Sequence, residues 1–252
     1  MRIGIFDSGV GGITVLKTAK ELLPNVDYIY YSDNNHVPYG TKTKEQVLGY
    51  VKEIVELLVR EEVDAIVIAC NTATSIAVAE LRKMYSIPII GMEPAVKLAL
   101  SNNKTGDILV TATPLTLKES KFKSLVSNLG EEDRVKKLAL PELVTYAEDM
   151  NFDEEILYKY FDEKFKGLDL SSISAVVLGC THFVYYKTML SKYLPKHIKI
   201  YDGNEGTIKH VKELLGNSPS MHIKKIPQMD FYYSGKKCED NIILNMYLNV
   251  LK

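Results

Sequence analysis

A short motif that occurs twice constrains this chain more than any other feature of its sequence. Each copy is an apolar run closed by a small residue, a cysteine and two polar side chains. The copies span residues 63–72 and 173–182 and align without a gap, with Cys180 in the place of Cys70. Such a run, short and rich in Val and Ile, is typical of a buried strand in a parallel sheet. We therefore predict two related α/β halves, each with a cysteine at the carboxyl end of a strand.

The polar residues after the two cysteines indicate what these strand ends are for. Open α/β sheets bind their ligands at the carboxyl ends of the strands, so the two thiols would face one cleft. The alternative is that both are core residues, because free cysteine is among the most buried residue types. The motifs continue with Asn71-Thr72 and Thr181-His182, where a core would continue apolar. This favours a functional site.

Composition and charge exclude several classes of protein. The chain has 252 residues, is 46% hydrophobic and has a net charge of −1, so it lacks the basic footprint of a nucleic-acid-binding protein. No apolar signal region opens it and no later run approaches a membrane span, so we expect a cytoplasmic protein that does not bind membranes. Three cysteines without a C-x-x-C pair predict reduced thiols and neither a disulfide framework nor a metal site.

The second half repeats the plan of the first, and a polar break at residues 102–106 separates them. We predict an α/β fold of two similar domains, each a mostly parallel sheet flanked by helices. They are related by a pseudo-twofold axis, with the active site in the cleft between them. The first domain is assigned to residues 1–97 plus 207–252 and the second to 98–206. Residues 230–235 are predicted to form an edge strand, and Cys238 lies in a polar segment where no function is expected.

A glycine-rich turn, Asp7-Ser8-Gly9-Val10-Gly11-Gly12, joins the first strand to a helix. Such a turn presents free backbone N–H groups to an anion. Its glycines do not fit G-x-G-x-x-G and no P-loop lysine follows, so a small carboxylate is a better candidate than a nucleotide. Asp7 itself has two interpretations, a functional carboxylate or a helix N-cap and turn former, and both stay open.

Two facing thiols suggest a particular chemistry. Two bases on opposite sides of one carbon, each able to take or give a proton, are what inversion of a stereocentre requires. An amino acid's α-proton is very weakly acidic, so the cysteine must act as a thiolate with a tuned pKa, away from water. A single Cys-His pair would instead suggest acyl transfer through a covalent intermediate. Cys180 and His182 fit that alternative, but it leaves Cys70 without a role.

Over almost its whole length the chain resembles the glutamate racemases of the cofactor-independent aspartate/glutamate racemase superfamily. The resemblance rests on the glycine-rich turn and on five further motifs: Pro38-Tyr39-Gly40, Ala69-Cys70-Asn71-Thr72-Ala73, Gly91-Met92-Glu93-Pro94, Ala112-Thr113-Pro114-Leu115-Thr116 and Gly179-Cys180-Thr181-His182-Phe183. It implies racemisation of L- and D-glutamate without metal or cofactor, supplying D-glutamate for peptidoglycan. The expected partner is this small substrate, and a homodimer stays open.

The resemblance also implies roles for individual residues. Cys70 and Cys180 are the two acid–base thiols, and Asp7, Glu148 and His182 assist them. The residues that hold the amino acid are Asp7, Ser8, Tyr39, Gly40, Asn71, Thr72, Thr113, Thr116, Thr181 and His182.

The chain departs from the family pattern in two places. After Phe183, where the family has a proline and aliphatic residues, it has Val184-Tyr185-Tyr186. Before Glu148 it has Leu140 and Thr145 in place of a cysteine and a second proline. Two other functions remain as alternatives: an aspartate racemase, and a binding or regulatory protein that senses an amino acid without turnover. Retention of both cysteines favours an enzyme.

Overall fold

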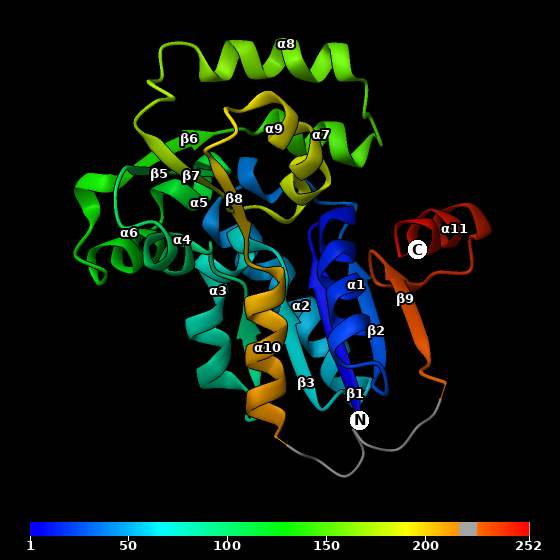
Figure 1. Ribbon diagram of the computed structural model, residues 1–252. Helices are drawn as coiled ribbons and strands as arrows, with labels where there is room; N and C mark the ends of the chain where they lie inside the picture. The colour runs from blue at the N-terminus through cyan, green and yellow to red at the C-terminus, as the bar shows by residue number, and fades with distance from the viewer. Residues whose placement is uncertain (217–225, 252) are drawn as a thin grey trace.

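The computed structural model describes residues 1–216 and 226–251 and contains two separate sheets (Figure 1). The first has the strand order β10-β9-β2-β1-β3-β4, and its neighbours are parallel except for β9 and β10. Its strands are β1 (Arg2–Asp7), β2 (Asp27–Ser32), β3 (Ala65–Ile68), β4 (Ile89–Gly91), β9 (Met229–Tyr233) and β10 (Lys236–Lys237).

The second sheet is parallel throughout, in the order β6-β5-β7-β8. Its strands are β5 (Asp107–Ala112), β6 (Val135–Ala139), β7 (Ile173–Leu178) and β8 (Lys199–Asp202). The order β2-β1-β3-β4 in the first sheet is the same as β6-β5-β7-β8 in the second, so both halves share one topology. Cys70 and Cys180 each stand two residues beyond the end of the equivalent strand, β3 or β7. The predicted α/β fold with two similar parallel sheets is confirmed.

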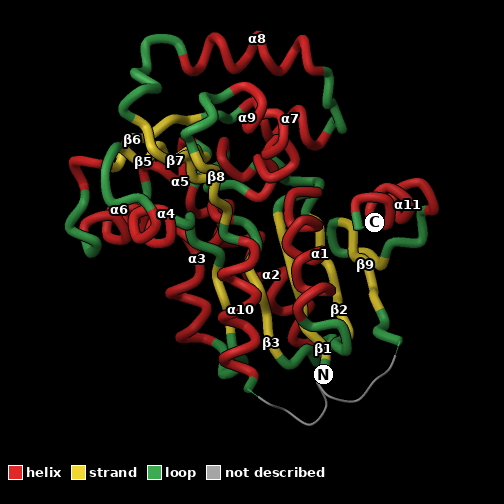
Figure 2. Tube along the Cα trace, viewed as in Figure 1, coloured by secondary structure: helices red, strands yellow, loops and turns green. Residues whose placement is uncertain are grey.

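Helices surround both sheets (Figure 2). The α-helices are α1 (Ile13–Leu22), α2 (Lys44–Arg60), α3 (Asn71–Met84), α4 (Val96–Asn102), α5 (Pro114–Lys118), α6 (Ser120–Ser127), α7 (Glu142–Glu148), α8 (Glu154–Phe165), α9 (Lys187–Tyr193), α10 (Asn204–Leu215) and α11 (Asn241–Val250). The 3-10 helices are η1 (Val10–Gly12), η2 (Tyr39–Thr41), η3 (Glu132–Arg134) and η4 (Thr181–Tyr186).

Helix α2 shows how local sequence builds these layers. Thr43 and Gln46 form a reciprocal capping box that satisfies backbone donors at its start. An apolar stripe at helical spacing is then buried against one face of the first sheet. The stripe consists of Val47, Val51, Ile54, Val55 and Leu58.

The chain returns to the first sheet after β8. Helix α10 runs beside α1, and its Ile208 and Val211 join the core that covers one face of the first sheet (Figure 1). Strand β9 then pairs with β2. The domain boundaries at 97/98 and 206/207 stay predictions, and residues 217–225 and 252 of the first assigned domain lie outside the described residues.

The expectation that residues 230–235 form an edge strand is wrong. Strand β9 pairs with β2 on one side and with β10 on the other, so β10 lies at the edge. Ser234 and Gly235 both have positive φ, 45° and 87°, which is the backbone of a tight two-residue hairpin turn. This turn folds the chain back and covers what would have been the exposed edge.

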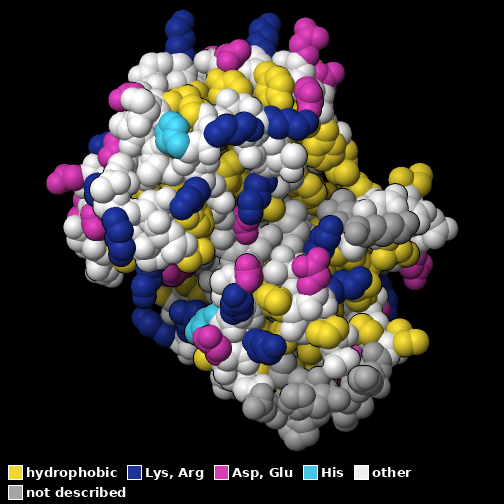
Figure 3. All heavy atoms as spheres, viewed as in Figure 1, with side chains coloured by type: hydrophobic (Ala, Val, Ile, Leu, Met, Phe, Trp, Pro, Cys, Tyr) yellow, Lys and Arg dark blue, Asp and Glu magenta, His cyan; other side chains and the backbone are white. Residues whose placement is uncertain are grey.

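The surface agrees with the composition. On the face shown in Figure 3, Lys and Arg side chains alternate with Asp and Glu over both halves. Within residues 1–216 and 226–251, the helices are all too short or too polar to cross a membrane.

Candidate active site

One small cavity between the two sheets is lined by both duplicated cysteines. It has a volume of about 10 Å³, which is close to the room that one water molecule needs. Pro38 and Val144 line it together with residues that the sequence had singled out. Those residues are Ser8, Tyr39, Gly40, Cys70, Asn71, Thr72, Thr113, Cys180 and His182. The remaining candidates, Asp7, Glu148, Thr116 and Thr181, lie directly behind this lining and contact it.

Cys70 is placed at the start of a long helix. It is the N-cap residue of α3, and its sulfur accepts a hydrogen bond from the backbone N–H of Ala73 at 3.5 Å. The Ser8 hydroxyl lies 3.8 Å from the same sulfur. Burial raises the pKa of Cys70 and the neighbouring Asp7 carboxylate raises it further, whereas the bond from the Ala73 N–H group and the bond that the thiol makes to the Ser8 hydroxyl lower it. Burial therefore favours the neutral thiol form of Cys70 in this cavity.

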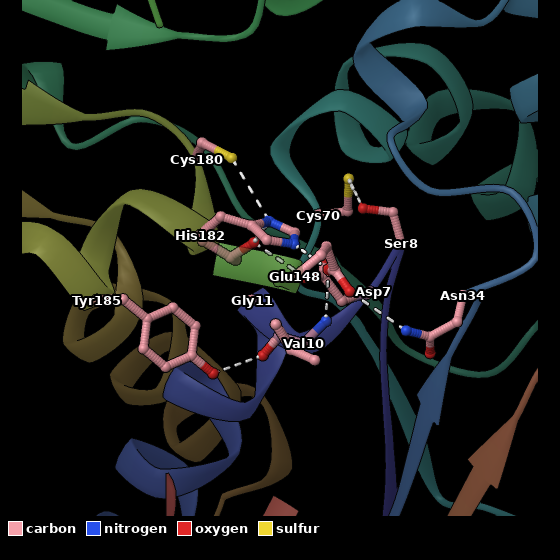
Figure 4. Close-up of polar contacts among 12 residues, drawn as sticks. Asp7, Ser8, Val10, Gly11, Asn34, Cys70, Glu148, Cys180, His182 and Tyr185 are labelled. Carbon is pink, nitrogen blue, oxygen red and sulfur yellow. Dashed lines mark hydrogen bonds and ion pairs between the residues drawn. The ribbon is translucent and has the colours of Figure 1, made fainter. Parts of the chain in front are cut away.

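Cys180 occupies the equivalent position with different neighbours. It precedes the 3-10 helix η4, and its side chain makes no capping bond there. Its sulfur instead lies 3.8 Å from Nδ1 of His182, two residues along the chain (Figure 4). The first thiol is thus supported by a helix N–H group and a hydroxyl, and the second by an imidazole.

His182 links Cys180 to a carboxylate. Its Nε2 donates to Oε1 of Glu148 at 2.5 Å. Burial lowers the pKa of His182, but its bonds to Cys180 and Glu148 outweigh this effect and leave that pKa well above its ordinary value. Glu148 comes from the end of α7 and also accepts bonds from the Val10 backbone N–H (2.9 Å) and from Asn34 Nδ2 (3.3 Å). The bonds to Cys180 and Glu148 thus favour the imidazolium form of His182, and the Glu148 carboxylate is itself fixed by the first domain.

Asp7 is fully buried at the end of β1. One carboxylate oxygen, Oδ2, accepts the Thr181 hydroxyl at 3.0 Å, and the group also accepts the Gly12 backbone N–H. Oδ1 has no hydrogen-bond partner among the described residues. Burial raises the pKa of Asp7, partly offset by the charge of His182 and the bond from Thr181. Asp7 does not cap α1, whose N-cap is Gly12, although its bond to Gly12 does shape the turn.

The glycine-rich turn is required because the second domain packs onto it. A Cβ at Gly9 would lie 1.8 Å from Glu148 Oε1, and one at Gly11 would lie 2.5 Å from both His182 Nδ1 and Thr181 Oγ1. The anion that meets the Val10 N–H group of this turn is the protein's own Glu148. The turn therefore serves at least in part to seat the His182–Glu148 pair.

Threonine hydroxyls join the two halves on the other side of the cavity. Thr72 at the start of α3 lies 2.9 Å from Thr113 and 3.0 Å from Thr116, Oγ1 to Oγ1. Thr113 and Thr116 are 3.0 Å apart, and Thr113 also caps α5. Each hydroxyl can donate or accept, so this cluster could rearrange to bind a carboxylate.

Several residues at the site were missed by sequence reasoning. Asn34 contacts Glu148, and Asp33 accepts the Tyr39 hydroxyl at 2.6 Å. Tyr185 donates its hydroxyl to the Val10 carbonyl at 2.8 Å. Asn34 and Asp33 belong to the polar loop at the end of β2, whose position at a strand end was the available signal. Tyr185 was noticed only as a departure from the family pattern.

A metal centre has no evident place here. In the described part of the chain, no group of three or more His, Cys, Asp or Glu side chains is arranged to hold a metal ion. What the cavity does offer is two thiols, an imidazolium held by a carboxylate, a buried carboxylate and several hydroxyl and amide groups. This set is suited to moving protons on a small polar molecule.

Comparison with known proteins agrees with this chemistry. The family model described as Asp/Glu/Hydantoin racemase matches residues 13–211. The glutamate racemase of Halothermothrix orenii is 51% identical over 253 residues, covering 100% of this chain and 99% of the relative. The crystal structure of glutamate racemase from Campylobacter jejuni has a TM-score of 0.86 at 28% identity, covering 100% of this chain and 98% of that one.

A second solved structure adds a ligand. Glutamate racemase from Francisella tularensis, crystallised in complex with D-glutamate, has a TM-score of 0.84 at 28% identity and covers 98% of this chain and 93% of that one. The extent of the family match and the identity to curated relatives both exceed what a shared fold alone would produce. The chain therefore belongs to the Asp/Glu/hydantoin racemase family and, within it, to the glutamate racemases.

Proposed function

We propose that this glutamate racemase inverts the α-carbon with Cys70 and Cys180 as two opposing acid–base groups, without metal or cofactor. One thiolate takes the α-proton and the electron pair stays on the substrate. The thiol of the other cysteine then gives a proton to the opposite face. The first sulfur ends as a thiol and the second as a thiolate, so protons must be exchanged before the next turnover in the same direction. The single observation that supports this proposal is that both cysteines line one cavity.

The neighbours of each sulfur suggest how it is activated. His182, held charged by Glu148, stabilises the Cys180 thiolate directly. The Ala73 N–H group and the Ser8 hydroxyl do the same for Cys70 more weakly. We therefore assign His182 and Glu148 as helpers of Cys180.

Asp7 is assigned to the substrate's ammonium group and to the Cys70 side of the site. Its buried Oδ1 lacks a partner among the described residues, and a cation is the natural partner for such an oxygen. The substrate's carboxylates are assigned to the surrounding hydroxyl, amide and backbone donors. These come from Ser8, Tyr39, Gly40, Asn71, Thr72, Thr113, Thr116, Thr181 and His182.

The size of the cavity requires a motion. A volume of about 10 Å³ does not admit glutamate, so the two domains must separate for substrate to enter and product to leave. In the closed arrangement the thiols and the substrate are kept from water, which favours abstraction of a weakly acidic proton.

The physiological role that we propose is the supply of D-glutamate for peptidoglycan, and the D-glutamate complex of the Francisella tularensis neighbour supports the product. Expression of the chain in a bacterial strain that requires D-glutamate should remove that requirement.

A cytoplasmic location is proposed because two free thiols must stay reduced, which that compartment ensures. The homodimer stays a prediction.

The mechanism is tested by Cys70→Ser and Cys180→Ser, with Cys238→Ser as the matched control. Each of the first two should lower kcat by about a thousandfold or more, because a hydroxyl is far too weak an acid to replace the thiol. Cys238 lies outside the cavity and its replacement should leave kcat within about twofold. Turnover is followed by optical rotation and by loss of the α-proton signal in deuterated water. Near wild-type turnover in either site variant would rule out the two-thiol mechanism.

A further inference from the structure

Tyr185 joins the two domains at the edge of the site. It belongs to η4 of the second half, and its hydroxyl donates to the Val10 carbonyl of η1 in the first half at 2.8 Å (Figure 4). Its ring packs on Phe152, with centroids 6.1 Å apart, and contacts the cores of both halves. Burial raises the pKa of Tyr185, so the phenol stays protonated and remains a donor.

The residue that Tyr185 holds is connected to Cys180 by a continuous path. The Val10 N–H group donates to Glu148 Oε1 at 2.9 Å. The same oxygen accepts the 2.5 Å bond from His182, whose other ring nitrogen lies 3.8 Å from the Cys180 sulfur. A shift of the Val10 peptide would therefore move a donor away from the carboxylate that keeps His182 charged.

The backbone around Val10 is rich in glycine, and its own bonds include one from the Ile13 N–H group to the Val10 carbonyl. Gly9, Gly11 and Gly12 flank it, and glycine has more backbone freedom to lose than any other residue. The N-cap of η1 makes no side-chain capping bond. Two tyrosine hydroxyls add side-chain bonds to this turn, with Tyr30 of β2 donating to the Gly9 carbonyl at 2.5 Å and Tyr185 to the next carbonyl along. Only the second of these ties the turn to the domain that contains Cys180.

We propose that Tyr185 is a positioning residue for one side of the reaction. Its hydroxyl fixes the Val10 peptide so that Glu148 is held against His182, and it thereby supports proton transfer at Cys180. Tyr185 touches neither the sulfur nor the substrate cavity, so it acts only through this path. The inference rests on the proposed function, because it takes Cys180 and His182 as an acid–base pair.

The test compares Tyr185→Phe with Tyr186→Phe. Each variant removes one hydroxyl and keeps the ring, and the Tyr186 hydroxyl donates to the Asn151 carbonyl at 3.1 Å, away from the site. The substrate is a β-substituted glutamate that loses its leaving group after one deprotonation, so each enantiomer reports on one thiol. His182→Asn first identifies which enantiomer depends on Cys180.

Tyr185→Phe should slow elimination from that same enantiomer by about tenfold, the factor expected for one buried hydrogen bond. Elimination from the other enantiomer should stay within about twofold, and KM should change little for both. Tyr186→Phe should leave both rates within about twofold. Thermal unfolding of both variants shows whether they remain folded at the assay temperature.

The possible results separate the two hypotheses. If His182→Asn slows neither enantiomer selectively, the proposed pairing of His182 with Cys180 fails, whatever Tyr185 does. If His182→Asn is selective but Tyr185→Phe matches Tyr186→Phe, the role of Tyr185 alone is overturned. Equal slowing of both enantiomers by Tyr185→Phe would also overturn it, because a general loss of domain packing would then suffice.

Discussion

The turns that contain Cys70 and Cys180 occupy the same place in two copies of one fold, yet they surround their sulfurs with different chemistry. Cys70 begins an α-helix of 14 residues and accepts one of its free N–H groups. Cys180 begins a 3-10 helix, gains no capping bond and has His182 beside it instead. Two copies of one backbone therefore surround their cysteines with different polar groups.

The difference follows from what comes after each sulfur. A regular α-helix presents several parallel N–H groups at its start, which favour a thiolate through partial charges. After Cys180 the chain enters a 3-10 helix instead, and the imidazole two residues on lies 3.8 Å from the sulfur, where its protonated form would favour a thiolate. In the proposed mechanism each cysteine serves one face of the substrate, so its surroundings would tune that face independently of the other.

Among the groups that surround the thiols, His182 should have the largest effect, and its replacement separates the two thiols directly. His182→Asn should slow elimination from one enantiomer of a β-substituted glutamate by about a hundredfold, because the Cys180 thiolate is then no longer stabilised by an imidazolium. Ser8→Ala should slow elimination from the other enantiomer by about threefold, since the Ser8 hydroxyl is a weak hydrogen-bond partner at 3.8 Å from the Cys70 sulfur. The measurement is the elimination rate for each pure enantiomer. If both variants slowed elimination from the same enantiomer, the assignment of His182 to Cys180 and of Ser8 to Cys70 would have to be abandoned.

An intermediate effect is expected from filling the space between the domains. Gly11→Ala would place a methyl group 2.5 Å from His182 Nδ1 and Thr181 Oγ1, so the Cys180 turn must move and kcat should fall about thirtyfold. Gly206→Ala is the control, because a Cβ there, in α10, meets nothing within 4 Å. That variant should keep full activity and gain up to about 1 kcal/mol of stability from helix propensity. Steady-state kinetics and urea unfolding check both, and full activity in Gly11→Ala would contradict the packing described here.

The smallest expected effect concerns stability. Only the first half has a buried carboxylate at the end of its central strand, since the last residue of β5 is Ala112 where β1 ends with Asp7. Burial raises the pKa of Asp7, so its stabilising contribution is complete below the ordinary carboxyl value of about 4 and is lost as the pH rises through the folded-state pKa. Asp7→Asn avoids that loss while impairing activity.

At pH 7, Asp7→Asn should therefore raise the free energy of unfolding by about 1 kcal/mol. The gain should shrink as the pH falls through the folded-state pKa and vanish below about 4, where wild-type Asp7 becomes protonated in both states. Urea unfolding at a series of pH values measures this difference. A gain that stays constant with pH, or a loss at pH 7, would show that the carboxylate is stabilised by partners beyond Thr181 and Gly12.

Much of the arrangement was present in the sequence because it is local. Apolar runs and turn residues predicted the strands, and the ungapped repeat predicted two similar sheets with a cysteine at equivalent strand ends. The segment at 230–235 shows the limit of such reasoning. The segment was correctly predicted to contain a strand, but its edge position depended on whether two positive-φ residues would turn the chain back, and only the fold decided that.

What the tertiary structure alone decided is how the halves meet. The bonds from Val10 to Glu148, from Thr181 to Asp7 and from Tyr185 to Val10 each cross between segments more than a hundred residues apart. No periodicity links such residues, because their contact depends on the packing of two domains rather than on a repeating backbone. The sequence placed two thiols at strand ends, with His182 two residues after Cys180 and a helix directly after Cys70, and domain packing determined that the Glu148 carboxylate beside His182 would be held by the Val10 N–H group of the other half.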